Sequence, residues 1–315
     1  MIHLRLVVAG DAAAVVERLE ADPTVINIVH LPGAARRPYG DLVLCDVPRE
    51  TASDVVRTLR LAGLDHEGSI TIEVVDTMVS DRARAAERRA PGAPWDAVVW
   101  ESVRARAVES AEPSGVFAAF MMLAALIAAI GIMTDSIILI IGAMVVGPEF
   151  GPMAGFCLAT LERRWRLARQ CLLSLSVGFV LAMTTAFLGT LASRGLGIAP
   201  EAQPLAERVA TIFISRPDEF SVLVAGLAGV AGILSLTTNK GGTLVGVFIS
   251  VTTIPAAADV GVSAAYGDAD AWRGSLLQLG VNVGAMVAAG LLTLRVQQYF
   301  YAHHNHEGPD HGRKR

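Results

Sequence analysis

The sequence is short of charge and of cysteine, and it lacks two of the commonest catalytic motifs. Charged residues make up 18% of its 315 positions, below the roughly one quarter that is usual for soluble proteins. The net charge of −4 predicts neither a nucleic-acid partner nor an acidic ligand. The 3 cysteines are scattered, which indicates inert core thiols rather than a disulfide framework. Neither HExxH nor GxSxG occurs, and we expect no enzyme, no cofactor and no metal site.

What the chain has instead is long apolar segments, all in one part of it. Residues 1–112 are ordinary in charge, whereas residues 116–297 hold six apolar runs separated by short polar stretches. About 20 residues with a rise of 1.5 Å each cross the roughly 30 Å of hydrocarbon in a bilayer. The pattern therefore predicts an α-helical polytopic membrane protein behind a soluble front part. The predicted spans are 116–134, 137–161, 170–193, 219–237, 243–264 and 275–296. The predicted domains are 1–80 (soluble), 81–112 (basic connector), 113–298 (transmembrane) and 299–315 (disordered cytoplasmic tail).

Residues 1–80 have the pattern strand, helix, two strands, helix, strand. "IHLRLVV" alternates with a period of two, "TVINIVHL" is typical of a second strand, and residues 32–40 are typical of a turn. Two such halves predict a ferredoxin-like α+β sandwich, in which both helices cover one face of an antiparallel sheet. Two roles are open for it, assembly or ligand sensing, and the candidate ligand contacts are Gly10–Asp11 and the GAARRPYG loop. The two helices repeat one apolar face, formed by Val15, Val16 and Leu19 and then by Val55, Val56 and Leu59.

Basic residues gather on one side of the predicted spans. Because positive charge favours the cytoplasmic side, we expect both termini in the cytoplasm and the protein in the plasma membrane. The connector is expected to be either a helix on the inner membrane surface or a stalk helix packed on its neighbours. The residues that set this orientation are Arg82, Arg84, Arg88, Arg89, Arg104, Arg106, Arg163, Arg164, Arg166, Arg169, Lys240, Arg313, Lys314 and Arg315.

The first two spans resemble the fourth and fifth. "LIAAIGI" at 126–132 aligns with "LAGVAGI" at 227–233, and Gly142 aligns with Gly246 after three extra residues. Three spans per repeat is an odd number, so the second repeat would cross the membrane in the opposite direction. The alignment predicts a 3+3 inverted repeat, an arrangement that recurs in secondary transporters with the site near the bilayer midplane.

The second span carries residues that a helix in lipid tolerates poorly. Pro148 and Pro152 each remove an amide donor, and Gly147 and Gly151 stand beside them. We therefore predict that the helix is unwound over 147–152. Backbone groups that are freed in lipid need partners, so the break must face protein or a wet cavity.

Glu149 lies in this predicted break, where an ionised carboxylate is expensive. Three interpretations compete: a proton or cation site that titrates during transport, a protonated plug that binds freed carbonyls, and a solvated carboxylate in a vestibule. In the fifth and sixth spans, polar and proline residues are expected near the same depth. The predicted midplane binding site comprises Gly147, Pro148, Glu149, Gly151, Pro152, Thr252, Thr253, Pro255, Asp259 and Asn282.

The stretch "AALIAAIGIMTDSIILIIGAMVVGPEFGPMAG" resembles a known family. It is similar to the hallmark of the bacterial and archaeal "uncharacterised hydrophobic domain" integral membrane proteins, domain-of-unknown-function family 389. The shared pattern is "IAAIG", a polar turn with Ser136, "IGAM" and a "GPxxGP" segment, and the resemblance covers about residues 110–260. This chain has Glu149 where many relatives have an apolar residue. The resemblance implies the membrane architecture and no particular activity.

Two classes of function fit these observations. The first is a transporter or channel-like permease for a small solute or ion, with or without coupling to protons, which broken spans, an inverted repeat and a mid-membrane acid favour. The second is a non-transporting membrane sensor or scaffold, for which Glu149 and the prolines are only structural. The expected partners are the lipid bilayer, a small solute or ion and further copies of the same chain in a homo-oligomer.

Overall fold

The computed structural model divides the chain into two compact units. One contains Met1–Val103 and Phe300–Arg315, and the other, called the membrane unit below, contains Arg104–Tyr299. The residues that the structure describes are 1–75, 77–90, 98, 100–200, 214–215, 218–238 and 253–304.

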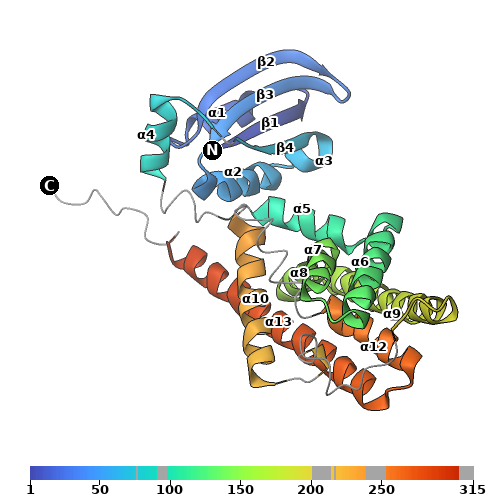
Figure 1. Cartoon of the computed structure of the whole chain (residues 1–315). Helices are drawn as coiled ribbons and strands as arrows, with labels where there is room; N and C mark the ends of the chain where they lie inside the picture. The colour runs from blue at the N-terminus through green and yellow to red at the C-terminus, as the bar shows by residue number, and fades with distance from the viewer. Residues whose placement is uncertain are drawn as a thin grey trace. The chain divides into compact units, whose positions relative to one another are not determined.

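The N-terminal unit contains the predicted elements in the predicted order, with one short helix added (Figure 1). Its four strands form one antiparallel sheet in the order β2-β3-β1-β4. The added helix is α3, which follows the positive-φ residue Gly63. The elements are β1 (Ile2–Ala9), α1 (Ala13–Glu20), β2 (Ile26–Arg36), β3 (Tyr39–Val47), α2 (Arg49–Leu61), α3 (Leu64–Glu67) and β4 (Ser69–Val74).

The core of this unit follows from the alternation in its sequence. Every second residue of β1 is buried, because successive side chains of a strand point to opposite faces of the sheet. The apolar faces of α1 and α2 pack into the same core, as the sequence predicts. Cys45 on β3 is fully buried there, and burial raises the pKa of its thiol to about 12, which fits an inert core residue.

The β2–β3 hairpin differs from the predicted turn over residues 32–40. Strand β2 continues to Arg36, with an irregularity in its pairing between Leu31 and Ala35. Asp41 on β3 organises this region, since its carboxylate accepts hydrogen bonds from the Gly33 amide at 2.8 Å and from the Ala12 amide at 3.0 Å. His30 Nε2 lies 2.8 Å from the same carboxylate. Pro32 and Gly33 therefore fit inside β2, because hydrogen bonds to the Asp41 side chain hold the bulge in place.

Exchange of Asp41 for Asn is expected to loosen this hairpin. The hydrogen bonds from Gly33, His30 and Ala12 hold the pKa of Asp41 at about 2, below its value of about 3.9 in unfolded chains. The carboxylate therefore stabilises the fold above about pH 4, and this contribution is lost as the pH falls towards 2. Hydrogen exchange of β2 and β3 peptides should be faster in the Asp41→Asn variant at pH 7, and less affected by acid between pH 4 and 2.

Asp81→Asn is the matched control for this prediction, because Asp81 is exposed and pairs only locally with Arg84. It should leave exchange in β2 and β3 unchanged. Equal protection of the hairpin in the parent and the Asp41→Asn variant would show that the carboxylate does not hold the bulge.

In its described residues the membrane unit consists of helices, and four of them are long and apolar enough to cross a bilayer. A fifth span is added if the bent pair α7 and α8 is counted as one.

The predicted spans 116–134, 170–193, 219–237 and 275–296 coincide with α6, α9, α10 and α13, and 137–161 with the bent pair. The predicted span 243–264 lies partly outside the described residues, and its described part is the short helix α12. The described residues thus show four to five candidate spans, and the six spans and the repeat stay predictions. The helices are α4 (Asp81–Arg89) in the N-terminal unit, α5 (Trp100–Ala111), and then α6 (Gly115–Met133), α7 (Ile137–Val146), α8 (Phe150–Leu161), α9 (Trp165–Gly195), α10 (Glu219–Thr238), α12 (Ile254–Tyr266) and α13 (Ala269–His304).

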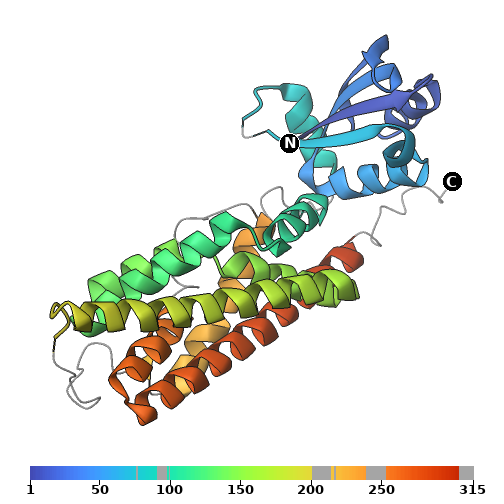
Figure 2. The same cartoon turned by 90° about the vertical axis from the view of Figure 1, so that its right-hand side faces the viewer.

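Helix α12 lies against α9 and α6, and α8 also lies against α9 (Figures 1 and 2). Gly261 makes the contact between α12 and α9 close: a Cβ atom there would overlap the Met183 carbonyl oxygen and lie 2.7 Å from the Phe187 amide nitrogen. Small residues at such points let two backbones approach in a membrane protein. On α5, the Arg104 Nε donates to Glu162 at 2.6 Å.

The tail predicted at 299–315 begins as helix, since α13 continues to His304, and residues 305–315 lie outside the described residues.

Candidate functional site

The second span is broken, as the sequence predicts, but over fewer residues. Helix α7 ends at Val146, α8 begins at Phe150, and the two are bent by 51°. The predicted break over 147–152 is therefore too long, because Gly151 and Pro152 lie in the first turn of α8. The first amides of a helix have no partner within it, so a proline there costs no hydrogen bond. With about 15 Å of helix before the break and about 18 Å after it, Glu149 lies near the middle of the span.

Glu149 is fully buried at this break, with 0% of its surface exposed. The Thr253 hydroxyl, which is also fully buried, donates a hydrogen bond of 2.7 Å to Glu149 Oε1. Gly147 leaves room for the carboxyl group, since a Cβ atom there would overlap Oε2 and approach Ile254 to 2.8 Å. The interpretation of Glu149 as a solvated vestibule residue is therefore wrong for this structure.

Glu149 and Thr253 are both N-cap residues, of α8 and of α12. Neither side chain caps its own helix; instead the two meet each other. The start of a helix carries a partial positive charge of roughly half an elementary charge. Two helix starts thus meet at one carboxyl group in the apolar interior, an arrangement that resembles the ion sites formed by helix ends. Pro255 lies in the first turn of α12, where proline is tolerated for the same reason as Pro152.

Asp259 does not join Glu149, contrary to the single midplane site predicted from the sequence. It is buried on α12 six residues after Thr253, which is about 1.7 helical turns. Its two carboxylate oxygens accept hydrogen bonds from the Ser263 hydroxyl at 3.2 Å and from the Ser275 hydroxyl at 2.5 Å. Ser263 and Ser275 were missed from the sequence. Ser263 is four residues from Asp259 on one helix, a spacing that signals contact, whereas Ser275 is on α13 and carries no such signal.

Asn282 is fully buried on α13, where Gln278 Nε2 donates to its Oδ1 at 3.4 Å. Thr252 lies outside the described residues. Within the described part of the chain, no group of three or more His, Cys, Asp or Glu side chains is placed to hold a metal ion. The predicted site residues thus separate into a central pair, Glu149 with Thr253, and a second cluster around Asp259.

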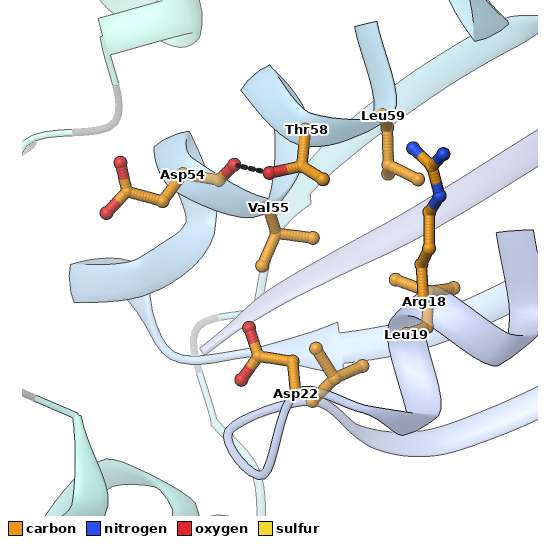
Figure 3. A pocket seen from close by; sticks show the side chains of 8 residues that line it. Arg18, Leu19, Asp22, Asp54, Val55, Thr58 and Leu59 are labelled. Atoms are coloured by element: carbon orange, nitrogen blue, oxygen red, sulfur yellow. Dashed lines mark hydrogen bonds between the residues drawn. The ribbon is translucent and has the colours of Figure 1, made fainter. Parts of the chain in front are cut away.

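A small hollow of about 100 Å³ lies between α1 and α2 of the N-terminal unit (Figure 3). Its floor is apolar, and charged or polar side chains stand at its edges, among them Arg18, Asp22 and Thr58. The candidate ligand contacts predicted from the sequence are elsewhere, at Gly10–Asp11 and in the GAARRPYG loop. Asp11 only accepts a hydrogen bond from the Ala13 amide at 2.9 Å, which is ordinary turn geometry.

The geometry defines a class of protein, one with several helices long and apolar enough to cross a membrane and a break between two of them at a buried acid. Residues 144–288 match the family described as "Domain of unknown function (DUF389)". The chain is also 25% identical over 166 residues to Uncharacterized protein MJ0678 of Methanocaldococcus jannaschii, a match that covers 53% of this chain and 49% of the relative. These matches confirm the resemblance seen in the sequence: the chain is similar to the DUF389 family over residues 144–288. The chain spans about half the length of this relative, and no solved structure matches it.

Proposed function

We propose that the membrane unit is a permease in which Glu149 carries a proton during passage. The observation that supports this most is the fully buried carboxyl group at the break of a bent span, bonded to the start of a second helix. Ionisable residues at this depth are costly and are found along ion and proton pathways. Burial on all sides implies a closed arrangement, so passage requires the break to open in turn towards each face.

The proposed inverted repeat gains support from the same contact. The alignment that pairs Gly142 with Gly246 also pairs Glu149 with Thr253. These two residues begin helices at corresponding places in the two halves, and their side chains meet. In secondary transporters built from inverted repeats, half-helix starts of this kind surround the binding site at the repeat interface.

The orientation that we propose follows the basic residues, with both termini in the cytoplasm of a bacterial or archaeal cell. The hairpin between α12 and α13 then faces the outside. We also propose that the β2-β3-β1-β4 sheet with α1 and α2 is a ferredoxin-like domain, which regulates or assembles the membrane unit.

Proton flux into proteoliposomes tests the permease. The purified chain is reconstituted with a pH-sensitive dye inside, and a potassium gradient with valinomycin supplies the driving voltage. The parent should acidify the lumen faster than protein-free liposomes, and Glu149→Gln should reduce the rate by about 100-fold or to background, because an amide cannot release a proton. Glu219→Gln, at the exposed first residue of α10, is the control and should conduct like the parent.

Two results would contradict the proposal. One is a parent rate equal to that of protein-free liposomes, and the other is a Glu149→Gln variant that conducts like the parent. Size-exclusion profiles in detergent should be the same for all three proteins, which separates loss of flux from loss of fold.

A second candidate function is a membrane sensor, and the hollow between α1 and α2 is the observation that favours it (Figure 3). A cationic Arg18 and an anionic Asp22 across an apolar floor would suit a small zwitterion such as an amino acid. Sensing predicts that amino acids raise the unfolding temperature of the full chain, and that Arg18→Ala removes this shift.

A further inference from the structure

A stripe of buried polar side chains runs along α13 inside the membrane unit. It is formed by Ser275, Gln278 and Asn282, of which the first and last are fully buried and Gln278 is 4% exposed. Spacings of three and four residues place all three on one face of the helix. The opposite face carries exposed residues such as Leu276 and Leu277, as expected of a side that faces lipid.

The stripe spans the depth between the two buried acids. Helices α12 and α13 are joined by a turn of two residues, and the Ser275–Asp259 hydrogen bond sets their register. Thr253 lies thirteen residues before the last residue of α12, and Asn282 lies thirteen residues after the first residue of α13. At 1.5 Å per residue both lie about 20 Å from the turn, whereas Asp259 and Ser275 lie about 10 Å from it. The stripe therefore begins at the level of Asp259 and ends at the level of Thr253 and its partner Glu149.

Packing alone does not explain this set of side chains. A buried hydroxyl such as that of Thr190 needs no partner from another helix, because it donates at 2.8 Å to the Ala186 carbonyl of its own helix. A carboxyl group and two carboxamides cannot be satisfied in that way, and they lose their hydration on burial even where other helices supply partners. Leucine or alanine at these positions would fill the same space without that cost. Their polarity therefore points to a path for a polar or charged species.

The charges around this path are few. Along the described spans, α6 and α7 carry no titratable side chain, and Glu149 and Asp259 are the carboxylic acids away from the span ends. Around the C-terminal end of α12, α9 contributes Arg194, which donates to the Ala265 carbonyl at 2.5 Å. The first turn of α13 contributes Asp270 and Arg273.

We propose that Asp259 is a second proton-binding group, on the outer side of Glu149, and that the α13 stripe lines the path between them. This inference rests on the proposed permease. A proton from outside water forms an O–H bond with the Asp259 carboxylate. That bond then breaks as the proton passes to water held by the polar side chains of the stripe, and this water gives up a proton to form a new O–H bond on the Glu149 carboxylate, so protons are only passed on and nothing is oxidised or reduced.

Flux in the proteoliposomes described above tests this path. Asp259→Asn keeps the shape and both serine contacts but cannot release a proton, and it should slow proton flux at least about tenfold. Gln278→Leu and Asn282→Leu should also slow it. Thr293→Val is the matched control, because Thr293 is further along α13 and donates only to the Ala289 carbonyl of its own helix; it should conduct like the parent.

Failure of this inference is distinguishable from failure of the permease itself. If the parent conducts and Glu149→Gln does not, while Asp259→Asn conducts like the parent, the permease stands and the outer group is wrong. If the parent does not conduct, both are wrong. Flux that depends on sodium in place of protons, with Asp259→Asn still impaired, would make Asp259 a sodium ligand and overturn proton binding.

A labelling experiment gives a readout that a structural role would not produce. Hydrophobic carbodiimides react with protonated carboxyl groups in membranes, and mass spectrometry locates the adduct. In sealed proteoliposomes sorted for one orientation, labelling of Asp259 should fall as the pH on the hairpin side is raised, and should persist in Glu149→Gln. Labelling of Asp259 that follows only the pH of the opposite side, or no labelling at any pH, would overturn the assignment.

Discussion

Gly261→Ala is expected to destabilise the membrane unit by about 1–3 kcal/mol, because the added methyl group overpacks a tight contact. The atoms it would meet are the Met183 carbonyl and the Phe187 amide of α9, which are backbone atoms held by the hydrogen bonds of their helix and cannot turn aside as a side chain can. For a unit of this size the loss corresponds to a fall in unfolding temperature of roughly 2–12 °C. Thermal unfolding in detergent, followed by light scattering or tryptophan fluorescence, measures it.

Gly280→Ala is the matched control for this prediction. It is the same exchange in a membrane helix, but a Cβ atom at Gly280 would meet no atom within 4 Å. Alanine is favoured over glycine in helices by about 1 kcal/mol, so Gly280→Ala should be neutral or slightly stabilising. Equal unfolding temperatures for the two variants would mean that α9 and α12 are not in close contact.

The position of the broken span could be predicted from the sequence because its signals are local. Proline next to glycine, in a segment otherwise apolar for twenty residues, disrupts a helix wherever the chain folds. The length of the break could not be predicted, since it depends on which residue begins the next helix. Once Phe150 begins α8, Pro152 falls in a turn where its missing amide is not needed, and the break shrinks to residues 147–149.

It was harder to predict which residues share one site, because this depends on how deep each residue lies along its span. Glu149 and Asp259 belong to two apolar segments and are both expected near midplane within an error of a few residues. A shift of six residues along a helix is about 9 Å, which is enough to separate two hydrogen-bonded clusters. The contact between Ser275 and Asp259 needs the α12–α13 register, and sequence patterns do not supply registers between helices. In the N-terminal unit, by contrast, period-two alternation in β1 and the repeated helix face were sufficient to predict the sheet and its core.

Thr253→Val is expected to have a comparably large effect, on both stability and flux. Valine keeps the branched shape but removes the hydroxyl that donates at 2.7 Å to the buried Glu149 carboxyl group. A buried polar group that loses its hydrogen-bond partner costs about 1–3 kcal/mol, because no water can replace the donor. We expect a lower unfolding temperature in detergent and slower proton flux, whereas Thr253→Ser, which keeps the hydroxyl, should restore most of both.

Thr190→Val is the control, because it removes an equally buried hydroxyl that bonds only to its own helix. Its carbonyl partner, Ala186, is free to keep its helical hydrogen bond, so the cost should be a fraction of a kcal/mol. A double-mutant cycle then isolates the pair: in a Glu149→Leu background, Thr253→Val should cost about 1–3 kcal/mol less than in the parent. A coupling energy near zero would mean that the two helix starts are not held together by this bond, and the central site would lose the contact that joins its two halves.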